Sequence, residues 1–173
     1  IYWGYQDRLR RSGLIDFDDM LVYCYELFVG RPDILAQWQK RFRYILVDEF
    51  QDINHLQYQV VRMLAQPENN LFIVGDDDQS IYRFRGAKPE IMLGFQKDYP
   101  DAQVIFLDEN FRSTRAIVEA SGAVIRENQN RFSKTIRCDS KTGSPVEIRQ
   151  FTGQEQEGNY VIKCIRDAVS KGK

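Results

Sequence analysis

Three short aliphatic runs, each followed by acidic residues, constrain the fold of this chain more than any other feature. The runs and the acids that follow them are residues 44–47 before Asp48, 71–74 before Asp76, and 103–107 before Asp108. The acids lie 28 (76 − 48) and 32 (108 − 76) residues apart, the length of a βαβ unit. Runs without polar alternation are typical of strands covered on both faces. The sequence therefore predicts an α/β fold with a parallel sheet flanked by helices.

Helical patterns surround these runs. Residues 2–11 are expected to be the end of a helix, and further helices are predicted to begin at Asp16, Pro32, Asn54 and Ser113. Asp16 and Ser113 are candidate N-caps, and Asn54 with Gln57 three residues later forms a predicted capping box. One further helix is expected around Ile91, Met92 and Phe95.

The character of the chain changes after residue 126. Residues 127–144 are polar and are predicted to form a linker, and residues 145–151 alternate as a half-buried strand does. A last helical face begins near Tyr160. We therefore expect residues 1–126 to form the later part of one domain and residues 145–173 to begin a second.

Composition excludes several classes of protein. The net charge is −1, so any nucleic-acid site must be a local patch. The three cysteines are far apart and the single histidine, His55, stands alone, so neither a zinc site nor a disulfide framework is indicated. Without a signal peptide or a long apolar run, the expected location is cytoplasmic, with no membrane partner. The first residue is Ile1, so the chain is expected to be an internal segment.

The first strand ends at a pair of acids, Asp48 and Glu49. Ligands of open parallel sheets bind beyond the carboxyl ends of the strands. Paired acids at that place suit a metal ion together with a general base. The alternative is that the two carboxylates only solvate a turn and cap the next helix.

The second strand leads into a loop, residues 75–87, that is rich in functional side chains. Gln79 is able to hydrogen-bond a terminal phosphate or orient a water molecule without adding negative charge. Tyr82 and Phe84 alternate with two arginines, the second being Arg85, which is typical of sites where bases stack and phosphates are held. The alternative is that both rings fill the core beneath the loop.

The third run leads to Arg112 at a predicted helix start. A helix N-terminus favours an anion, and a guanidinium binds phosphate oxygens bidentately. The alternative is a surface ion pair with Glu109.

Together these segments resemble superfamily-one DNA helicases of the UvrD/Rep/PcrA family. Residues 48–52 resemble motif II of that family, residues 75–87 motif III and residues 110–114 motif IV, and residues 16–19 match its segment upstream of motif II. The resemblance implies a RecA-like parallel sheet, as in P-loop NTPases, and the start of a second RecA-like domain. It also implies an ATP-dependent helicase that moves 3′ to 5′ on single-stranded DNA.

The family's nucleotide roles carry over by position. Asp48 is expected to hold Mg²⁺ through water, and Glu49 to act as general base and to contribute to the metal site. Gln79 is expected to sense the γ-phosphate of ATP, and Arg112 to stabilise charge in phosphoryl transfer. Phe111, where the family often has tyrosine, is expected to stack on the adenine.

The DNA roles fall in motif III. Tyr82 and Phe84 are expected to stack on bases, and Arg85 to join motif III to DNA or to motif II. The family more often has tryptophan at the position of Phe84, so a smaller stacking platform is expected. The implied partners are single-stranded DNA and duplex/single-strand junctions, with DNA-repair or replication accessory proteins.

No G-x-x-x-x-G-K-[ST] phosphate loop occurs in the sequence, so the chain alone is expected to be inactive. Three alternatives remain at this stage. One is the motor part of a helicase–nuclease. The others are a metal-dependent nuclease or phosphatase that uses the strand-end acids Asp48, Asp76 and Asp108, and a non-catalytic single-strand-binding module.

Overall fold

The computed structural model describes residues 1–172, which form two compact units. The first unit comprises Ile1–Phe106 together with Asn128–Lys134. The second comprises Leu107–Glu127 and the chain from Thr135 onward. The chain thus leaves the first unit, returns to it for seven residues (128–134), and leaves it again.

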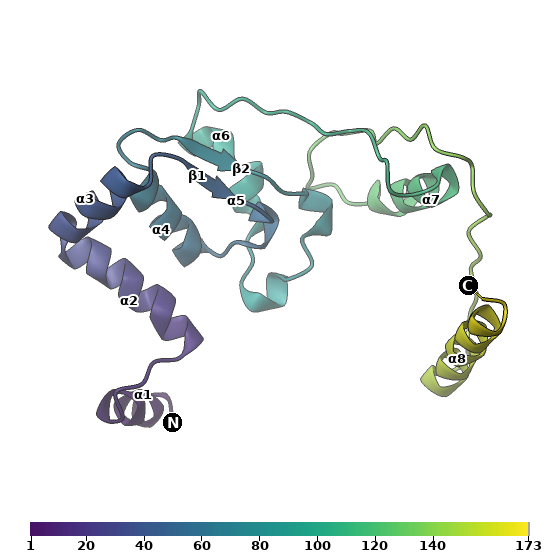
Figure 1. The fold of residues 1–173 in the computed structure, drawn as a ribbon, viewed down its shortest axis with the longest axis horizontal. Helices are drawn as coiled ribbons and strands as arrows, with labels where there is room; N and C mark the ends of the chain where they lie inside the picture. Colours follow the sequence, from purple (N-terminus) through teal and green to yellow (C-terminus); the bar gives the residue numbers. More distant parts are fainter. Residues whose placement is uncertain (173) are drawn as a thin grey trace. The chain divides into compact units, whose positions relative to one another are not determined.

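The first unit contains two strands and most of the helices (Figure 1). Its α-helices are α1 (Tyr2–Arg11), α2 (Phe17–Gly30), α3 (Pro32–Arg41), α4 (His55–Ala65), α5 (Pro89–Leu93) and α6 (Phe95–Asp98). The strands are β1 (Ile45–Val47) and β2 (Leu71–Ile73), and the short 3₁₀ turns are η1 (Phe50–Asp52), η2 (Asp77–Gln79) and η3 (Arg83–Arg85).

Two predicted helix starts are confirmed in detail. Asp16 caps α2 in a reciprocal capping box with Asp19, and Asn54 caps α4 in a second one with Gln57. In each box the cap side chain accepts the backbone N–H three residues later, and the side chain there accepts the cap's own N–H. These local contacts set the direction in which α4 leaves the end of β1.

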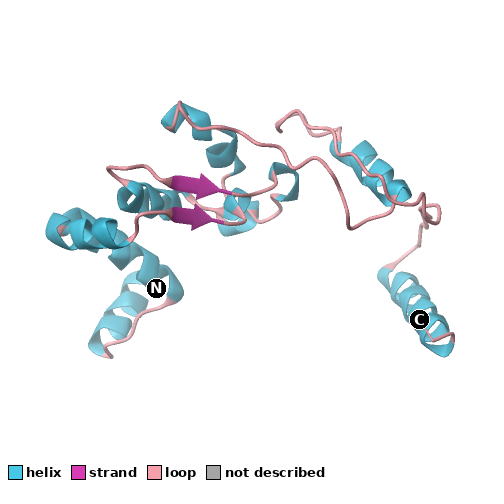
Figure 2. Ribbon diagram, turned by 45° about the horizontal axis from the view of Figure 1, so that its top comes forward, coloured by secondary structure: helices cyan, strands magenta, loops and turns pink. Residues whose placement is uncertain are grey.

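The parallel pairing of the first two predicted strands is also confirmed (Figure 2). Ile45 is opposite Leu71, and Val47 is opposite Ile73, with α4 between the strands in sequence. This arrangement is the expected β-α-β unit. It brings the carboxyl ends of both strands to the same edge of the sheet.

The third predicted strand is wrong for this structure. Residues 103–107 have no sheet partner, and Ile105 and Leu107 are largely exposed. Aliphatic composition favours a strand, but a strand forms only where a neighbouring edge accepts its hydrogen bonds. The two-stranded sheet formed by residues 1–172 brings no edge to this segment.

The core lies on one face of the sheet. Phe50 is completely buried, with its ring centroid 5.9 Å from that of Tyr58 and 5.7 Å from that of Phe95, both edge-to-face. Ile53 completes this cluster. Aromatic pairs in this geometry add about 0.5–1.5 kcal/mol each beyond their buried area.

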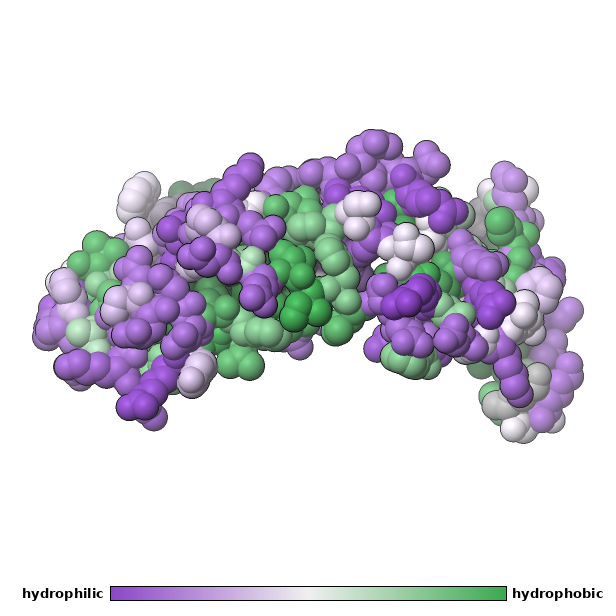
Figure 3. All heavy atoms as spheres, turned by 90° about the horizontal axis from the view of Figure 1, so that it is seen from above, coloured by the Kyte–Doolittle hydropathy of each residue, from purple (hydrophilic) through white to green (hydrophobic). Residues whose placement is uncertain are grey.

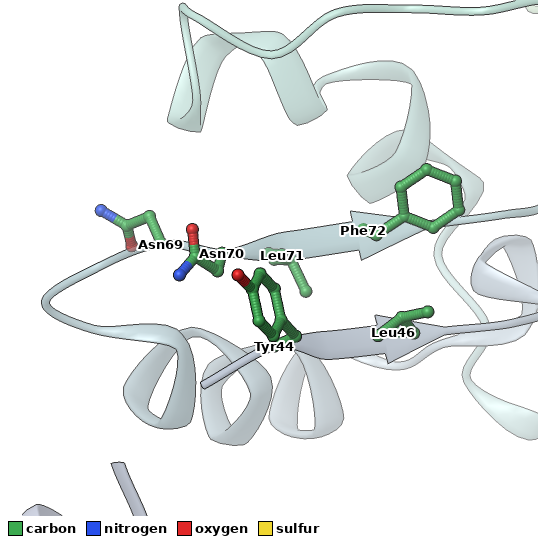
Figure 4. Close-up of a pocket in the computed structure, with 6 residues that line it drawn as sticks. All are labelled: Tyr44, Leu46, Asn69, Asn70, Leu71 and Phe72. Atoms are coloured by element: carbon green, nitrogen blue, oxygen red, sulfur yellow. The ribbon is translucent and has the colours of Figure 1, made fainter. Parts of the chain in front are cut away.

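The opposite face of the sheet is uncovered, which corrects the expectation of strands buried on both faces. Leu46 and Phe72, the central residues of β1 and β2, are 72% and 58% exposed. With Tyr44 they line a shallow apolar groove (Figure 4). Figure 3 shows hydrophobic side chains gathered in the middle of one face of the molecule. The apolar residues of β1 and β2 led us to expect a layer of helices on this face of the sheet as well. Residues 1–172 do not supply that layer.

The second unit contains α7 (Arg115–Ile125) and α8 (Gln154–Ser170). The helix α7 begins one residue later than predicted, with Thr114 rather than Ser113 at the N-cap. Its first amides are satisfied by the backbone carbonyls of Lys141 and Thr142 instead of a side-chain cap. The predicted helix near Tyr160 is confirmed as part of α8.

The strand predicted at 145–151 is wrong. Val146 and Ile148 are 50% and 94% exposed, and the segment has no pairing partner in the described part of the chain. Alternation of apolar and polar residues needs a neighbouring strand and a core face before it produces a half-buried strand.

Helices long and apolar enough to cross a membrane do not occur between residues 1 and 172.

Candidate active site

The two strand ends are held together by backbone hydrogen bonds. The Val74 amide donates to the Val47 carbonyl at 2.8 Å, and the Phe50 amide donates to the Val74 carbonyl at 2.9 Å. The chain after β1 therefore stays against the chain after β2. The acids that follow β1 and the polar loop that follows β2 share one edge of the sheet, as the parallel pairing of the strands requires.

Gly75 permits this close approach. A Cβ atom built on Gly75 would lie 2.6 Å from Oε1 of Gln51 and 3.1 Å from the Phe50 backbone nitrogen. The backbone cannot shift without breaking the strand-end hydrogen bonds. A glycine is therefore required where these two segments meet.

We expect Gly75→Ala to destabilise the protein by about 1–3 kcal/mol, the usual cost of inserting a methyl group into a closely packed place. The measurement is thermal unfolding of the full-length protein. The matched control is Gly4→Ala in α1, where a Cβ atom meets nothing within 4 Å. A Gly75→Ala protein as stable as the Gly4→Ala protein would contradict this packing argument.

Glu49 has a strained backbone. Its φ and ψ are 51° and 41°, in the left-handed region that glutamate rarely adopts. The Glu49 amide donates to Oδ1 of Asp48 at 2.9 Å, and both carboxylates are exposed. Such strain costs on the order of 1–3 kcal/mol and clusters at active sites. The turn directs Glu49 away from the strand and gives it a fixed partner in Gln51.

Gln51 links the two strand ends and is 2% exposed. Its Nε2 donates to Oε2 of Glu49 at 2.8 Å, while its Oε1 accepts the Asp76 amide at 3.0 Å. Its backbone carbonyl accepts a hydrogen bond from Ser80 at 3.3 Å. A single buried amide side chain thus orients the Glu49 carboxylate and fixes the start of the loop after β2.

The loop after β2 carries three consecutive acids held by two cations. Lys134 Nζ contacts the carboxylates of Asp76 at 2.5 Å and Asp78 at 3.2 Å, and it also hydrogen-bonds Asp77. Arg131 forms a bidentate pair with Asp78 at 2.6 and 2.7 Å. Among residues 1–172 these acids form one group compact enough to hold a metal ion, but the Lys134 ammonium already bonds all three.

This charge network shifts the acidity of its members. Arg131 holds the pKa of Asp78 below its ordinary value, although burial acts in the opposite direction. Burial raises the pKa of Asp76, but hydrogen bonds from Lys134 and Gln79 outweigh it and leave that pKa lowered. Both carboxylates therefore remain ionised at neutral pH.

Gln79 lies at the end of η2, with an exposed side chain. Its Nε2 donates to Oδ2 of Asp76 at 2.8 Å. The side-chain nitrogen is thereby engaged, and the side chain is anchored to the acid that Gln51 and Lys134 also hold.

Tyr82 and Phe84 form an accessible aromatic pair. Their ring centroids are 6.0 Å apart, and the Arg85 guanidinium lies 5.1 Å from the Tyr82 ring and 5.6 Å from the Phe84 ring. The two residues are 37% and 79% exposed. Neither ring fills the core beneath the loop, so both are open to a planar partner.

Phe111 and Arg112 belong to the second unit, whereas Glu49 and Gln79 belong to the first. Phe111 is 84% exposed. The Asn110 side chain accepts the amides of Arg112 at 3.0 Å and Ser113 at 2.8 Å, which shapes the turn before α7.

One acid near Arg112, Asp108, has another partner. Asp108 pairs with Arg137 at 2.9 Å, and this hydrogen bond lowers the pKa of Asp108. The alternative of an ion pair between Arg112 and Glu109 is not formed among the residues that the structure describes.

Comparison with known proteins decides the family. The family model of the UvrD/REP helicase N-terminal domain matches residues 1–100, and that of the UvrD-like helicase C-terminal domain matches residues 105–173. The chain belongs to the UvrD/REP helicase family. The segments recognised by resemblance to motifs II and III lie in the N-terminal match, and the segment similar to motif IV lies in the C-terminal one.

Individual relatives of this helicase family agree. The chain is 46% identical over 173 residues to YjcD of Bacillus subtilis, covering 99% of this chain and 23% of that protein. It is 45% identical to DNA helicase II of Rickettsia typhi (98% and 26%) and 41% identical to the ATP-dependent DNA helicase PcrA of Leuconostoc citreum (96% and 22%). The chain therefore spans about a quarter of the length of these relatives.

Sequence reasoning gave no role to two residues that organise this UvrD-family site. Gln51 lies inside the motif II segment and directly follows the hydrophobic Phe50. A polar residue beside a core residue was a signal that its side chain is buried and hydrogen-bonded. Lys134 offered no such signal, because it lies 58 residues from Asp76 in the sequence.

Proposed function

We propose that the chain is part of an ATP-dependent DNA helicase that couples ATP hydrolysis to 3′–5′ movement on single-stranded DNA and to duplex unwinding. The observation that carries this proposal is the bridge formed by Gln51. It joins the strained carboxylate Glu49 to the loop that bears Gln79 and the aromatic pair. Family membership and the names of the relatives support the same assignment.

In this proposal the first unit supplies the general base for ATP hydrolysis and the side chain that contacts the γ-phosphate. Glu49 removes a proton from the attacking water, and the hydrogen bond from Gln51 holds its carboxylate in one orientation. One N–H of the Gln79 side chain is anchored on Asp76, and the second N–H of the same Nε2 donates to the terminal phosphate. Loss or gain of that contact alters the loop, because Gln79 and the aromatic residues are a few residues apart on the same backbone.

The residues present fit Mg²⁺ and ATP in chemical type. Carboxylate oxygens are the ligands that Mg²⁺ prefers, and Asp48 and Glu49 are exposed at the strand end. Bound Mg²⁺ supplies charge neutralisation on the phosphate oxygens. In the second unit, Phe111 stacks on the adenine and Arg112 binds phosphate oxygens as negative charge develops. Both side chains are exposed.

The DNA function belongs to Tyr82, Phe84 and Arg85. Each exposed ring offers a base a stacking surface, worth about 1–3 kcal/mol per base. The Arg85 guanidinium lies close to both rings and supplies positive charge for the backbone phosphates. The partners are single-stranded DNA and duplex/single-strand junctions, with repair or replication proteins as accessory partners and the cytoplasm as the compartment.

The fold is part of the proposal as well. The β1-α4-β2 unit is consistent with the edge of a RecA-like sheet, and we assign residues 1–126 to the first RecA-like domain, 127–144 to a linker and 145–173 to the start of the second. A phosphate loop is absent from the sequence, so the chain alone is expected to hydrolyse negligible ATP.

The experiment that tests the proposal is strand displacement by the full-length protein on duplexes with a single-stranded tail at either end. Unwinding of the 3′-tailed duplex with ATP and Mg²⁺, and little unwinding of the 5′-tailed one, is expected. Unwinding only of the 5′-tailed duplex would contradict the direction. Cleavage of DNA with Mg²⁺ and no ATP would replace the motor with a metal-dependent nuclease.

We expect Gln51→Leu to lower ATP hydrolysis by the full-length protein about 10- to 100-fold, the usual cost of losing a residue that orients a functional group. The substitution keeps the side chain buried but removes the donor to Glu49 and leaves the Asp76 amide without its acceptor. An unpaired buried amide costs about 1–3 kcal/mol. The control is Gln59→Leu, a partly exposed residue of α4 whose side chain contacts His55 and not the strand ends. Equal ATP hydrolysis by the two variants would show that Gln51 does not orient Glu49 for catalysis.

A further inference from the structure

The acidic loop after β2 is gripped by a segment that is remote in sequence. Residues 128–134 follow α7 of the second unit, yet they pack with the first unit before the chain returns to the second. Three side chains or amides of this segment bind the loop. They are the Arg131 guanidinium on Asp78, the Phe132 amide on Asp77 at 2.7 Å, and the Lys134 ammonium on all three acids.

Lys134 is the member of this segment that reaches the nucleotide-sensing side chain. Its ammonium contacts Oδ1 of Asp76, and Oδ2 of the same carboxylate accepts the hydrogen bond from Gln79. The Lys134 side chain is only 11% exposed, so water screens this contact weakly. Arg131 is similarly sheltered at 14%, but it binds Asp78, whereas the Gln79 side chain donates its hydrogen bond to Asp76.

The chemistry of Asp76 explains why Lys134 matters. Two carboxylates, Asp77 and Asp78, stand beside Asp76, and the three acids offer oxygen atoms within 4.8 Å of one another. Lys134 is the cation that bonds Asp76, so without it repulsion from the neighbouring carboxylates either displaces the Asp76 carboxylate or raises its proton affinity, even though Arg131 still pairs with Asp78. Either change removes the fixed acceptor on which the Gln79 nitrogen rests.

We propose that Lys134 is a positioning residue for Gln79, acting through the shared carboxylate of Asp76. The segment that carries Lys134 connects directly to the second unit on both sides. This inference rests on the proposed function, because it assigns Lys134 a part in ATP turnover.

The test uses the full-length helicase and compares Lys134→Met with Arg131→Met. Both changes remove one sheltered cation from the same segment and the same acidic loop. We expect Lys134→Met to lower kcat for single-strand-stimulated ATP hydrolysis about 10- to 100-fold, in the range seen for outer residues that orient a functional group. We expect KM for ATP to change less, and Arg131→Met to keep kcat within about threefold. Equal loss in both variants would overturn the proposal, because loosening of the segment would then explain it.

A double-mutant cycle with Gln79→Ala separates positioning from general damage. If Lys134 acts through Gln79, adding Lys134→Met to Gln79→Ala lowers kcat little further. A full additional loss in the Gln79→Ala background would overturn the proposal. Asp76→Ser serves if Lys134→Met does not fold, because it removes the acceptor of Gln79 while Lys134 keeps Asp77 and Asp78. It is expected to give the same loss, and unchanged kcat would overturn the proposal.

ATP hydrolysis by the unaltered protein separates failure of the proposed helicase function from failure of the positioning role of Lys134. If it shows no ATP hydrolysis with single-stranded DNA, the proposed function fails and the role of Lys134 fails with it. If it is active and Lys134→Met is equally active, only the positioning role fails.

Discussion

Glu49→Gln is expected to reduce single-strand-stimulated ATP hydrolysis by the full-length protein at least 100-fold, in line with the 10²–10⁴-fold contribution of a general base. The glutamine retains an oxygen that accepts the hydrogen bond from Gln51 Nε2. It has the same backbone demands as glutamate at φ 51°, so the turn after β1 is preserved. The substitution therefore removes proton acceptance and little else. The measurement is steady-state ATP hydrolysis with and without single-stranded DNA.

Two controls make the Glu49 result specific. Glu68→Gln, in the exposed turn after α4, changes charge equally and is expected to leave hydrolysis unchanged. The affinity of the Glu49→Gln protein for single-stranded DNA is also expected to be retained, since the aromatic pair is untouched. Hydrolysis by Glu49→Gln within a few-fold of the unaltered protein would show that Glu49 is not the base.

Replacing both Tyr82 and Phe84 with alanine is expected to weaken single-stranded DNA binding by about 2–6 kcal/mol if each ring stacks on one base. The exposed fraction of Phe84, 79%, makes it the more available surface. Phe84→Trp is expected to tighten binding, because the larger ring offers more stacking area. The measurement is equilibrium binding of a labelled oligonucleotide at fixed salt.

The matched control for the aromatic pair is Ile81→Ala. Ile81 is 71% exposed in the same loop but presents no aromatic ring. Its loss is expected to leave the affinity for single-stranded DNA nearly unchanged. If the double alanine variant binds as tightly as Ile81→Ala, the aromatic pair has no part in holding the strand.

The elements that the sequence predicted well are those specified by neighbouring residues. The predicted N-cap at Asp16 and the predicted capping box at Asn54 involve partners three residues away, and the two parallel strands are joined by a single helix. Such contacts leave a readable local pattern. The meeting of the first two strand ends followed from parallel topology alone, which is why the approach of Glu49 and the loop after β2 was predictable.

The errors concern segments whose structure depends on distant partners. Residues 103–107 and 145–151 have strand-like composition, but neither has an edge to pair with between residues 1 and 172. The exposed apolar face around Leu46 and Phe72 has the same cause, since a covering layer cannot be supplied by the strands themselves.

The charge network was also beyond sequence reasoning. Lys134 lies in a polar stretch that was predicted to be a linker. Nothing in the neighbouring sequence distinguishes it from a solvent-exposed lysine. Its contact with three acids depends on the return of residues 128–134 to the first unit. Only the three-dimensional arrangement distinguishes this half-buried cation from the exposed residues beside it in sequence.

We propose that this chain belongs to a motor that is powered by ATP and moves on single-stranded DNA. The most direct measurement is the rate of ATP hydrolysis by the full-length protein as single-stranded DNA is added. We expect a rate that rises severalfold to saturation and depends on Mg²⁺. A full-length protein that binds single-stranded DNA but hydrolyses no ATP, with or without it, would contradict the account.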